Sequence, residues 1–285
     1  MERWTERLAS RSAVKVIVGL TRFDRVEVAF LTRLYALAGA DVLDVAAEPG
    51  VVASARRAAA EAVAGSPGAA RPAIMASLAL ACDPHVEGVT MDAAERAAVV
   101  PATAAELRAG VAACLEAGAD MFELHAAAGD DASLREAVEV MSPLLGERYL
   151  SICLGTQGRT SPQDAVRQAR LAQAVHGPHT MIQAEGLILG GRADPTSSLQ
   201  GLALAQVLLA HTSAYVLVAG AANHWTRHLA QLLAVPVHGV ACGAYARALV
   251  SGLEPVGPQG PGWEHAVQVA RAFVDQLRGG ACADG

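Results

Sequence analysis

The chain has 285 residues, of which 53% are hydrophobic and only 18% are charged, so it carries enough apolar surface to bury a large core. Its formal net charge of −6 and its pI near 5.8 argue against nucleic acid as a partner, because counterion release from a phosphate backbone needs clustered cations. The 5 cysteines are widely spaced and include no CxxC pair, so their spacing indicates neither a zinc site nor an iron–sulfur cluster.

Two further features bear on the compartment. The widely spaced cysteines are expected to be reduced thiols, and the polar, charged start contains no apolar signal segment, so a cytoplasmic protein is expected. Residues 197–226 contain no Asp, Glu, Lys or Arg, but polar interruptions indicate a helix followed by a strand. A membrane span needs about 20 apolar residues, so no membrane association is predicted.

Short apolar runs alternate along the chain with longer Ala-, Leu- and Arg-rich stretches of helical period, which is the pattern of βα units. The runs are nearly continuous in apolar residues, as expected of parallel strands buried on both faces. The 8 predicted strands are residues 14–20, 41–47, 72–80, 120–126, 149–155, 179–185, 214–220 and 236–242. They predict an α/β fold, a single (β/α)8 TIM barrel over residues 1–285.

Signals at the predicted helix ends support this division. Capping boxes begin at Asp24 and Thr103, and Ser161 precedes a proline at the first helical position. Gly39 and Gly118 each end a helix that leads directly into a strand.

Several segments depart from the simple repeat. Residues 1–12 are expected to form an N-terminal helix or arm, and residues 81–101 a long loop after the third strand without a clear helix. A short extra helix is expected at 244–250, after the eighth strand. Residues 257–262 are a predicted linker to a last amphipathic helix at 263–277.

Lys15, in the first predicted strand, is the only lysine in a chain with 22 Lys and Arg residues together. A lysine inside an apolar strand suggests a role that arginine cannot fill, because a desolvated amine can lose its proton and form a Schiff base. A structural ion pair with Asp44 on the next strand explains the residue equally well. Both interpretations stay open, and a paired lysine can also hold a substrate.

In such barrels the chemistry takes place at the C-terminal ends of the strands. Glu123 and His125 share one face of the fourth predicted strand, and Gln183 and Glu185 share one face of the sixth. If these faces point inward, they bring together the groups of general acid–base catalysis. Buried polar groups that satisfy one another are the structural alternative. Because no third ligand for a metal is evident, no metal is predicted.

An anion site is predicted at the turns after the seventh and eighth strands. Gly220 and Gly243 allow backbone N–H groups to approach a ligand closely, and the short helix after Gly243 would direct its N-terminus to the same place. Glycines that only form tight turns are the alternative. The other candidate binding residues are Asn223, Tyr245, Arg247, Gln183 and Arg192.

Several separate segments, in order along residues 14–252, resemble the light-dependent-period protein family of oxygenic phototrophs. They are the lysine-bearing first strand and residues 39–49, 75–85, 118–126, 217–226 and 238–250. A more distant similarity is to an uncharacterised plastid-encoded barrel family. The strand at 41–49 also looks a little like the second strand of pterin-binding barrels, although other pterin-site signals are not evident.

The resemblance implies the barrel and a set of matched positions whose role in the family is not assigned. These positions are Lys15, Asp44, Glu123, His125, Asn223, Gly243, Tyr245 and Arg247. The family is described as iron–sulfur proteins of redox sensing, with a ferredoxin-like insertion after the third strand. This chain has no cysteine cluster there, so an iron–sulfur cluster is not expected.

These residues predict an enzyme that binds a phosphorylated or carboxylated small molecule at the barrel mouth. Lys15 would form a Schiff base or hold the electrophile, with Glu123 and His125 as acid–base partners, in a lyase- or aldolase-like reaction. Asp44 and Glu185 are further candidate catalytic residues. One alternative is an oxidoreductase whose FMN phosphate occupies the anion site, and another is a non-catalytic redox or metabolite sensor or assembly protein. Association into a homo-oligomer is left open.

Overall fold

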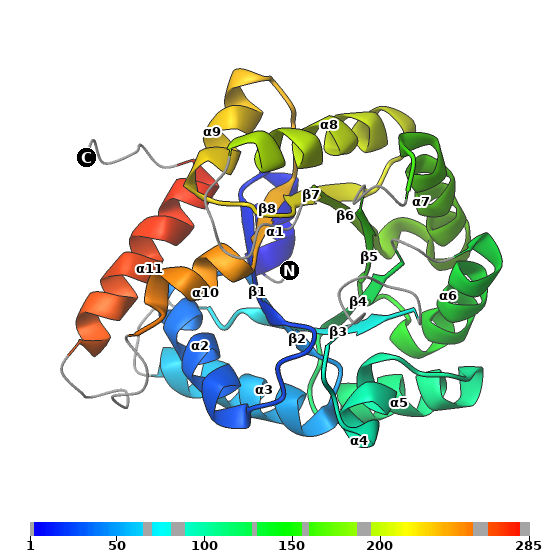
Figure 1. The fold of residues 1–285 in the computed structure, drawn as a ribbon, viewed down its shortest axis with the longest axis horizontal. Coiled ribbons are helices and arrows are strands. Elements are labelled where there is room, and N and C mark those ends of the chain that lie inside the picture. Colours follow the sequence, from blue (N-terminus) through cyan, green and yellow to red (C-terminus); the bar gives the residue numbers. More distant parts are fainter. Residues whose placement is uncertain are drawn as a thin grey trace.

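The computed structural model describes residues 3–64, 70–80, 89–126, 130–155, 160–186, 195–252 and 262–279. Parallel strands pair in chain order and close into an eight-stranded barrel, and helices form a ring around it (Figure 1). This confirms the predicted (β/α)8 barrel. The strands are β1 (Ala13–Gly19), β2 (Val42–Ala46), β3 (Ala73–Ala79), β4 (Met121–His125), β5 (Leu150–Gly155), β6 (Thr180–Glu185), β7 (Tyr215–Ala219) and β8 (Gly239–Cys242).

Three helices begin at the capping residues that the sequence predicts for them. Thr103 and Glu106 form both halves of a capping box, and Asp24 and Ser161 cap their helices. Gly39 has a φ of 90°, the left-handed conformation that glycine tolerates at a helix end. The helices are α1 (Arg3–Ala9), α2 (Arg25–Ala38), α3 (Pro49–Ala64), α4 (Ala93–Val99), α5 (Ala104–Glu116), α6 (Asp131–Leu145), α7 (Pro162–His176), the 3-10 turn η1 (Gly177–His179), α8 (Pro195–His211), α9 (His224–Leu232), α10 (Ala244–Val250) and α11 (Trp263–Arg278).

The irregular segments agree with the sequence only in part. The short helix expected at 244–250 is α10, and the last predicted helix is α11. The expectation of no clear helix within 81–101 is wrong, because α4 lies there and begins with a capping box formed by Asp92 and Glu95. Residues 81–88 and 253–261, which include most of the predicted linker, lie outside the described part of the chain.

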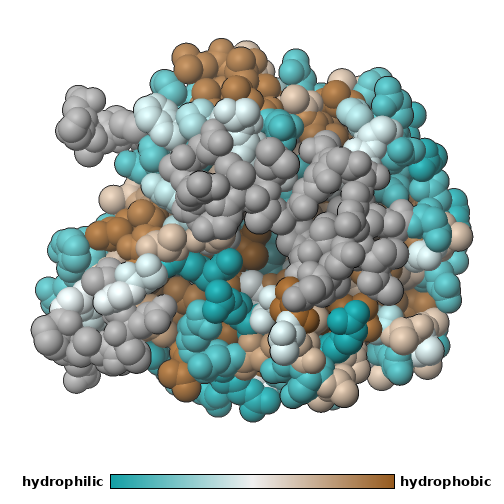
Figure 2. Space-filling model, viewed as in Figure 1, coloured by the Kyte–Doolittle hydropathy of each residue, from teal (hydrophilic) through white to brown (hydrophobic). Residues whose placement is uncertain are grey.

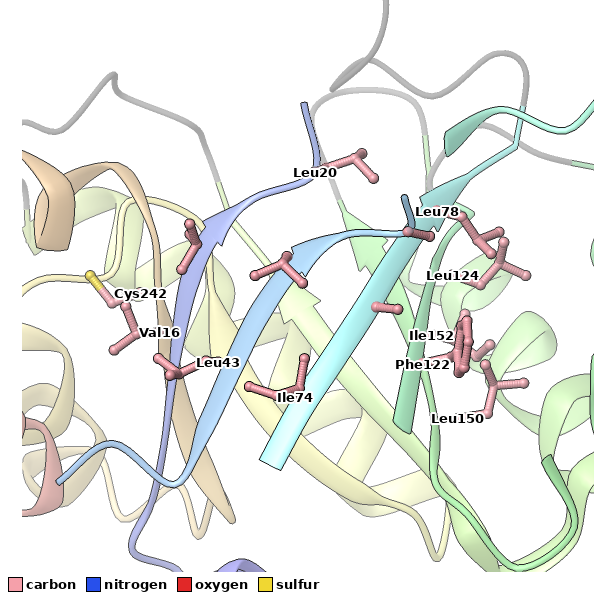
Figure 3. Close-up of a cluster of buried hydrophobic side chains, with 14 of the residues drawn as sticks. Val16, Leu20, Leu43, Ile74, Leu78, Phe122, Leu124, Leu150, Ile152 and Cys242 are labelled. Carbon is pink, nitrogen blue, oxygen red and sulfur yellow. The ribbon is translucent and has the colours of Figure 1, made fainter. Parts of the chain in front are cut away.

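Outward-facing strand side chains form the main core between the barrel and its helices. Val16, Leu43, Ile74, Phe122 and Leu124 are all buried in this layer (Figure 3). These positions alternate with inward-facing ones, as the two-residue period of a strand requires. The inward-facing residues therefore determine what the barrel interior can do.

Apolar side chains fill the N-terminal end of the barrel interior. Met75, Met121 and Met181 pack there against Trp4 and Leu8 of α1. In Figure 1 the helix α1 lies behind the strands, so the expected N-terminal helix closes this end of the barrel. Polar inward-facing residues are concentrated toward the opposite end.

The surface of the face seen in Figure 1 is mainly hydrophilic around the ring of helices (Figure 2). An apolar area lies over α9, where Leu232 is 67% exposed and Leu233 is 50% exposed. Within the described residues, no single helix is long and apolar enough to span a membrane, and α4 and α5 pass that test only as a pair bent by 88°.

Asp120, immediately before β4, ties together the N-terminal ends of neighbouring strands. Its carboxylate accepts hydrogen bonds at 2.8 Å from Arg56, from Arg71 and from the backbone N–H of Ile74. Burial opposes ionisation, but the hydrogen bonds and the two guanidinium charges outweigh it and hold the pKa of Asp120 below its usual range.

Replacing Asp120 with asparagine is expected to lower the free energy of unfolding by about 1.5–3 kcal/mol at about pH 7, because hydrogen bonds to a charged group are lost. Since the folded pKa is depressed, this stabilisation is present above the unfolded pKa of about 4 and is lost as the pH falls through the folded pKa. Urea unfolding at about pH 7 and about pH 3 should show the difference between wild type and variant narrowing in acid. Glu139→Gln, in an exposed pair with Arg135, should change stability by less than about 0.5 kcal/mol. This account would be contradicted if the stability difference between wild type and Asp120→Asn were as large at about pH 3 as at about pH 7.

Candidate functional site

A buried ion-pair network surrounds Lys15 in the barrel interior. Lys15 Nζ donates hydrogen bonds to Glu123 Oε2 at 2.6 Å and to Gln183 Oε1 at 2.8 Å. The same ammonium lies 2.8 Å from Asp44 Oδ2. Each of these side chains is at most 1% exposed. The structure thus brings together predicted site residues from β1, β2, β4 and β6.

Two serines complete the network. The Ser77 hydroxyl donates to Asp44 Oδ1, and Ser151 Oγ donates to Glu123 Oε2 at 2.7 Å. Neither serine was predicted as part of the site, although a hydroxyl within an otherwise apolar strand was a signal for both. Ser77 gives a partner to Asp44 Oδ1, and Ser151 adds a second donor to Glu123 Oε2, which Lys15 also contacts.

The network fixes the charge state of Lys15. Burial alone would lower its pKa, but the charges of Asp44 and Glu123 raise it above the ordinary value. Burial opposes ionisation of Glu123, but Lys15 and His125 together outweigh this effect and hold the pKa of Glu123 below its usual range. For Asp44, burial raises the pKa. Because a Schiff base forms from a neutral amine, these contacts favour the ion-pair interpretation of Lys15.

A second polar group lies one step nearer the C-terminal ends of the strands. His125 Nε2 is 3.2 Å from Glu123 Oε1. Cys153, which pairs in register with His125 on one side and Gln183 on the other, accepts a hydrogen bond from Gln183 Nε2 at 3.3 Å. Its Sγ lies 3.8 Å from Glu185 Oε2. Cys153 was not predicted as a site residue, because only the strand register reveals these neighbours.

A cavity of about 160 Å³ lies at the C-terminal end of the barrel, next to this second group. His125 and Glu185 contribute to its inner surface, which we call the floor. Gly220 and Gly243 line it from the ends of β7 and β8, together with Arg22 after β1. Lys15 and Glu123 are not among the described residues that line this cavity. They lie behind its floor, where Glu123 contacts His125.

The two positions of the predicted anion site, 220 and 243, are occupied by glycine for different structural reasons. Gly220 has a φ of +79°, and a Cβ there would lie 2.4 Å from the backbone N of Gly186. Gly220 is therefore required by the tight turn and by close packing. Gly243 has a φ of −116°, and its Cβ would meet Ile17 Cβ at 3.2 Å. Its missing side chain chiefly keeps the cavity open.

Asn223 is buried and caps α9. Its Oδ1 accepts from the backbone N–H of Trp225 at 2.9 Å, and its Nδ2 donates to the carbonyl of Ala221 at 2.8 Å. Asn223 is not among the described residues that line the cavity, so these contacts favour a structural role. Arg192, predicted as an additional cation, lies outside the described residues.

Tyr245 and Arg247 of α10 do line the cavity. The Tyr245 hydroxyl lies 2.9 Å from His224 Nδ1, and Arg247 Nη1 donates to the carbonyl of Ile17 at 2.8 Å. Burial lowers the pKa of Arg247, and the nearby charge of Arg22 adds to this effect. Arg22, which was not predicted, thus places a second cation on the same wall of the cavity.

No protein-family model matches the chain, and no curated protein is similar to it in sequence. Solved structures match its fold. Ribulose-1,5-bisphosphate carboxylase/oxygenase from Pyrococcus horikoshii is 10% identical with a TM-score of 0.59, over 93% of this chain and 58% of that chain. A truncated 3-deoxy-D-arabino-heptulosonate 7-phosphate synthase from Thermotoga maritima is 11% identical with a TM-score of 0.55, over 91% and 84%. Thiamine phosphate pyrophosphorylase from Pyrococcus furiosus is 12% identical with a TM-score of 0.51, over 95% and 98%.

The likeness is one of fold. At these identities the matches establish the (β/α)8 barrel and nothing finer, and this chain spans little more than half of the Pyrococcus horikoshii chain. They do not bear on the resemblance to the light-dependent-period family, which stays a prediction.

Proposed function

We propose that the barrel mouth binds a phosphorylated or carboxylated small molecule and acts on it at the cavity floor. The observation that carries this proposal is a single cavity with Arg22 and Arg247 on one wall and His125 and Glu185 at the floor. In this arrangement the two cations can bind the anionic group of a ligand. The imidazole and the carboxylate can then contact the rest of that ligand. The names of three structural neighbours, a bisphosphate carboxylase, a 7-phosphate synthase and a thiamine phosphate pyrophosphorylase, also denote phosphorylated compounds.

The wall of the cavity supplies the anion contacts. Arg22 extends from the turn after β1 and is 48% exposed, so its guanidinium can turn toward a ligand in place of Glu27. Arg247 is held by backbone carbonyls and adds fixed positive charge. Gly243 lets the ligand approach the backbone closely, because no side chain intervenes.

The floor supplies the reactive groups. Lys15 acts as a fixed cation that orients Glu123, and Glu123 in turn lies 3.2 Å from His125. In the proposal, His125 and Glu185 contact the reacting part of the ligand. Lys15 positions Glu123 and does not form the Schiff base that the sequence suggested. A lyase- or isomerase-type reaction is the class that these groups fit best.

The dimensions favour a small ligand over FMN. The cavity volume of about 160 Å³ among the described residues is below the range of about 300–1,000 Å³ typical of sites for larger organic ligands. A non-catalytic sensor would bind its ligand at the same anion site. Conversion of the bound ligand into a product would show that the protein is an enzyme and not a sensor.

Calorimetric titration with inorganic phosphate, glycerol 3-phosphate and pyruvate tests the proposal. Arg22→Ala is expected to weaken binding of the anion about tenfold, the loss of one charge-assisted hydrogen bond of about 1.5 kcal/mol. Arg25→Ala is the matched control, because Arg25 is 62% exposed, lies in the same segment and is not a described cavity-lining residue. Equal affinities for wild type and Arg22→Ala, or no binding of any of the three compounds, would refute the site.

A further inference from the structure

We infer that Glu123, His125 and Cys153 bind a divalent transition-metal ion at the cavity floor. The sequence offers only Glu123 and His125 as a pair, and the barrel adds Cys153 from the neighbouring strand. Each residue presents one ligand atom, these atoms lie within 4.8 Å of one another, and the three residues are buried. Carboxylate, imidazole and thiolate are established ligands of such ions in proteins.

The separations suit a tetrahedral ion. Bonds of about 2.0–2.2 Å to nitrogen and oxygen place two such ligands roughly 3.3 Å apart in a tetrahedron. Glu123 Oε1 and His125 Nε2 are 3.2 Å apart. Cys153 Sγ lies within 4.8 Å of both atoms, on the residue paired with His125, so a small movement of its side chain would bring the thiolate to the same ion.

Hydrogen bonds from neighbouring residues orient the ligand atoms of Glu123 and Cys153. Lys15 and Ser151 both donate to Glu123 Oε2, so Oε1, the oxygen nearest His125, is the one available to an ion. Gln183 Nε2 donates to Cys153 Sγ at 3.3 Å, a contact that also stabilises a thiolate. Outer hydrogen bonds of this kind hold metal ligands in place.

The ligand set and its position indicate the kind of ion and its use. Mixed nitrogen, oxygen and sulfur ligands favour an ion of the zinc class over magnesium or calcium, which prefer oxygen alone. Three protein ligands leave a fourth position, as in metal sites that act on substrates. His125 lines the cavity, so this position would meet the anionic ligand. In that use the inference rests on the proposed function, but ion binding itself does not need the organic ligand.

Titration of chelator-treated protein with Co²⁺, followed by absorption spectroscopy, tests the site. Wild type is expected to develop a thiolate-to-cobalt charge-transfer band in the near ultraviolet, because Cys153 would bind the ion directly. Cys153→Ser should lose this band, and His125→Gln should weaken Co²⁺ binding by at least about 100-fold. Cys242→Ser is the control, since Cys242 is also buried in the barrel but donates to the carbonyl of Ala222, outside the three-residue group.

A folded wild-type protein, verified by circular dichroism, that shows no such band would overturn the inference, as would a band that survives in Cys153→Ser. Titration of the metal-free protein with glycerol 3-phosphate separates the two proposals. Anion binding without the cobalt band refutes the metal site alone. The band without binding of phosphate, glycerol 3-phosphate or pyruvate refutes the anion site alone.

Discussion

Replacing Lys15 with methionine is expected to lower the free energy of unfolding by about 3–5 kcal/mol, because one partner of a buried ion pair is removed. Methionine is also unbranched and is one atom shorter than lysine, but it leaves Asp44 and Glu123 without their cation. Both carboxylates are fully buried, so removal of the ammonium leaves buried negative charge uncompensated. Urea unfolding near neutral pH measures the loss.

A surface pair provides the matched control. Arg33 Nη2 lies 2.6 Å from Glu61 Oε2, but Glu61 is 53% exposed. Arg33→Met should therefore cost less than about 1 kcal/mol, since solvent screens an exposed pair. If Lys15→Met is no more destabilising than Arg33→Met, the buried ion-pair network does not stabilise the folded protein as proposed.

Replacing Gly220 with alanine is expected to cost at least about 3 kcal/mol, because a left-handed backbone strain is combined with a steric clash. The added Cβ would lie 2.4 Å from the nitrogen and 2.6 Å from the oxygen of Gly186. These are backbone atoms, so neither can rotate away. The turn after β7 would have to separate from the end of β6, which thermal or urea unfolding would detect.

Gly243→Ala is the comparison, because the same change of one methyl group meets a different environment. Its nearest neighbour would be the Ile17 side chain at 3.2 Å, and its φ is negative. We expect a loss of stability below about 1.5 kcal/mol, together with weaker binding of glycerol 3-phosphate in the narrowed cavity. Equal losses of stability in the two variants would contradict the different roles given to these glycines.

The fold could be predicted from the sequence because barrel strands are buried on both faces and therefore form nearly continuous apolar runs. The last strand is shorter than predicted, since Pro236 and the two residues after it precede β8. The helix α4 was missed in a segment interpreted as loop, although Asp92 and Glu95 carried its capping signal.

The inward-facing pairs of the site could also be predicted, since Glu123 with His125 and Gln183 with Glu185 follow the two-residue period of a strand. The sequence placed Lys15 and Glu123 in one site, but their direct ion pair could not be predicted, because it depends on how the closed barrel arranges β1 and β4. Sequence period likewise gives no register between strands, so the place of Cys153 beside His125 became visible only in the structure.

The cations were predicted less completely. Arg22 follows β1 in a turn without a recognisable motif, and only the closed barrel places it beside Arg247 of α10. The sequence also could not separate the two glycines, since a close approach between Gly220 and Gly186 depends on how two turns pack.

The most direct measurement for the barrel-mouth site is a crystal structure of the protein saturated with glycerol 3-phosphate. We predict density for the phosphate within hydrogen-bonding distance of Arg22 and the backbone N–H of Gly243, with the carbon chain directed toward His125 and Glu185. Density for the ligand only at another place on the molecule, with this cavity empty at saturating concentration, would contradict the proposed function.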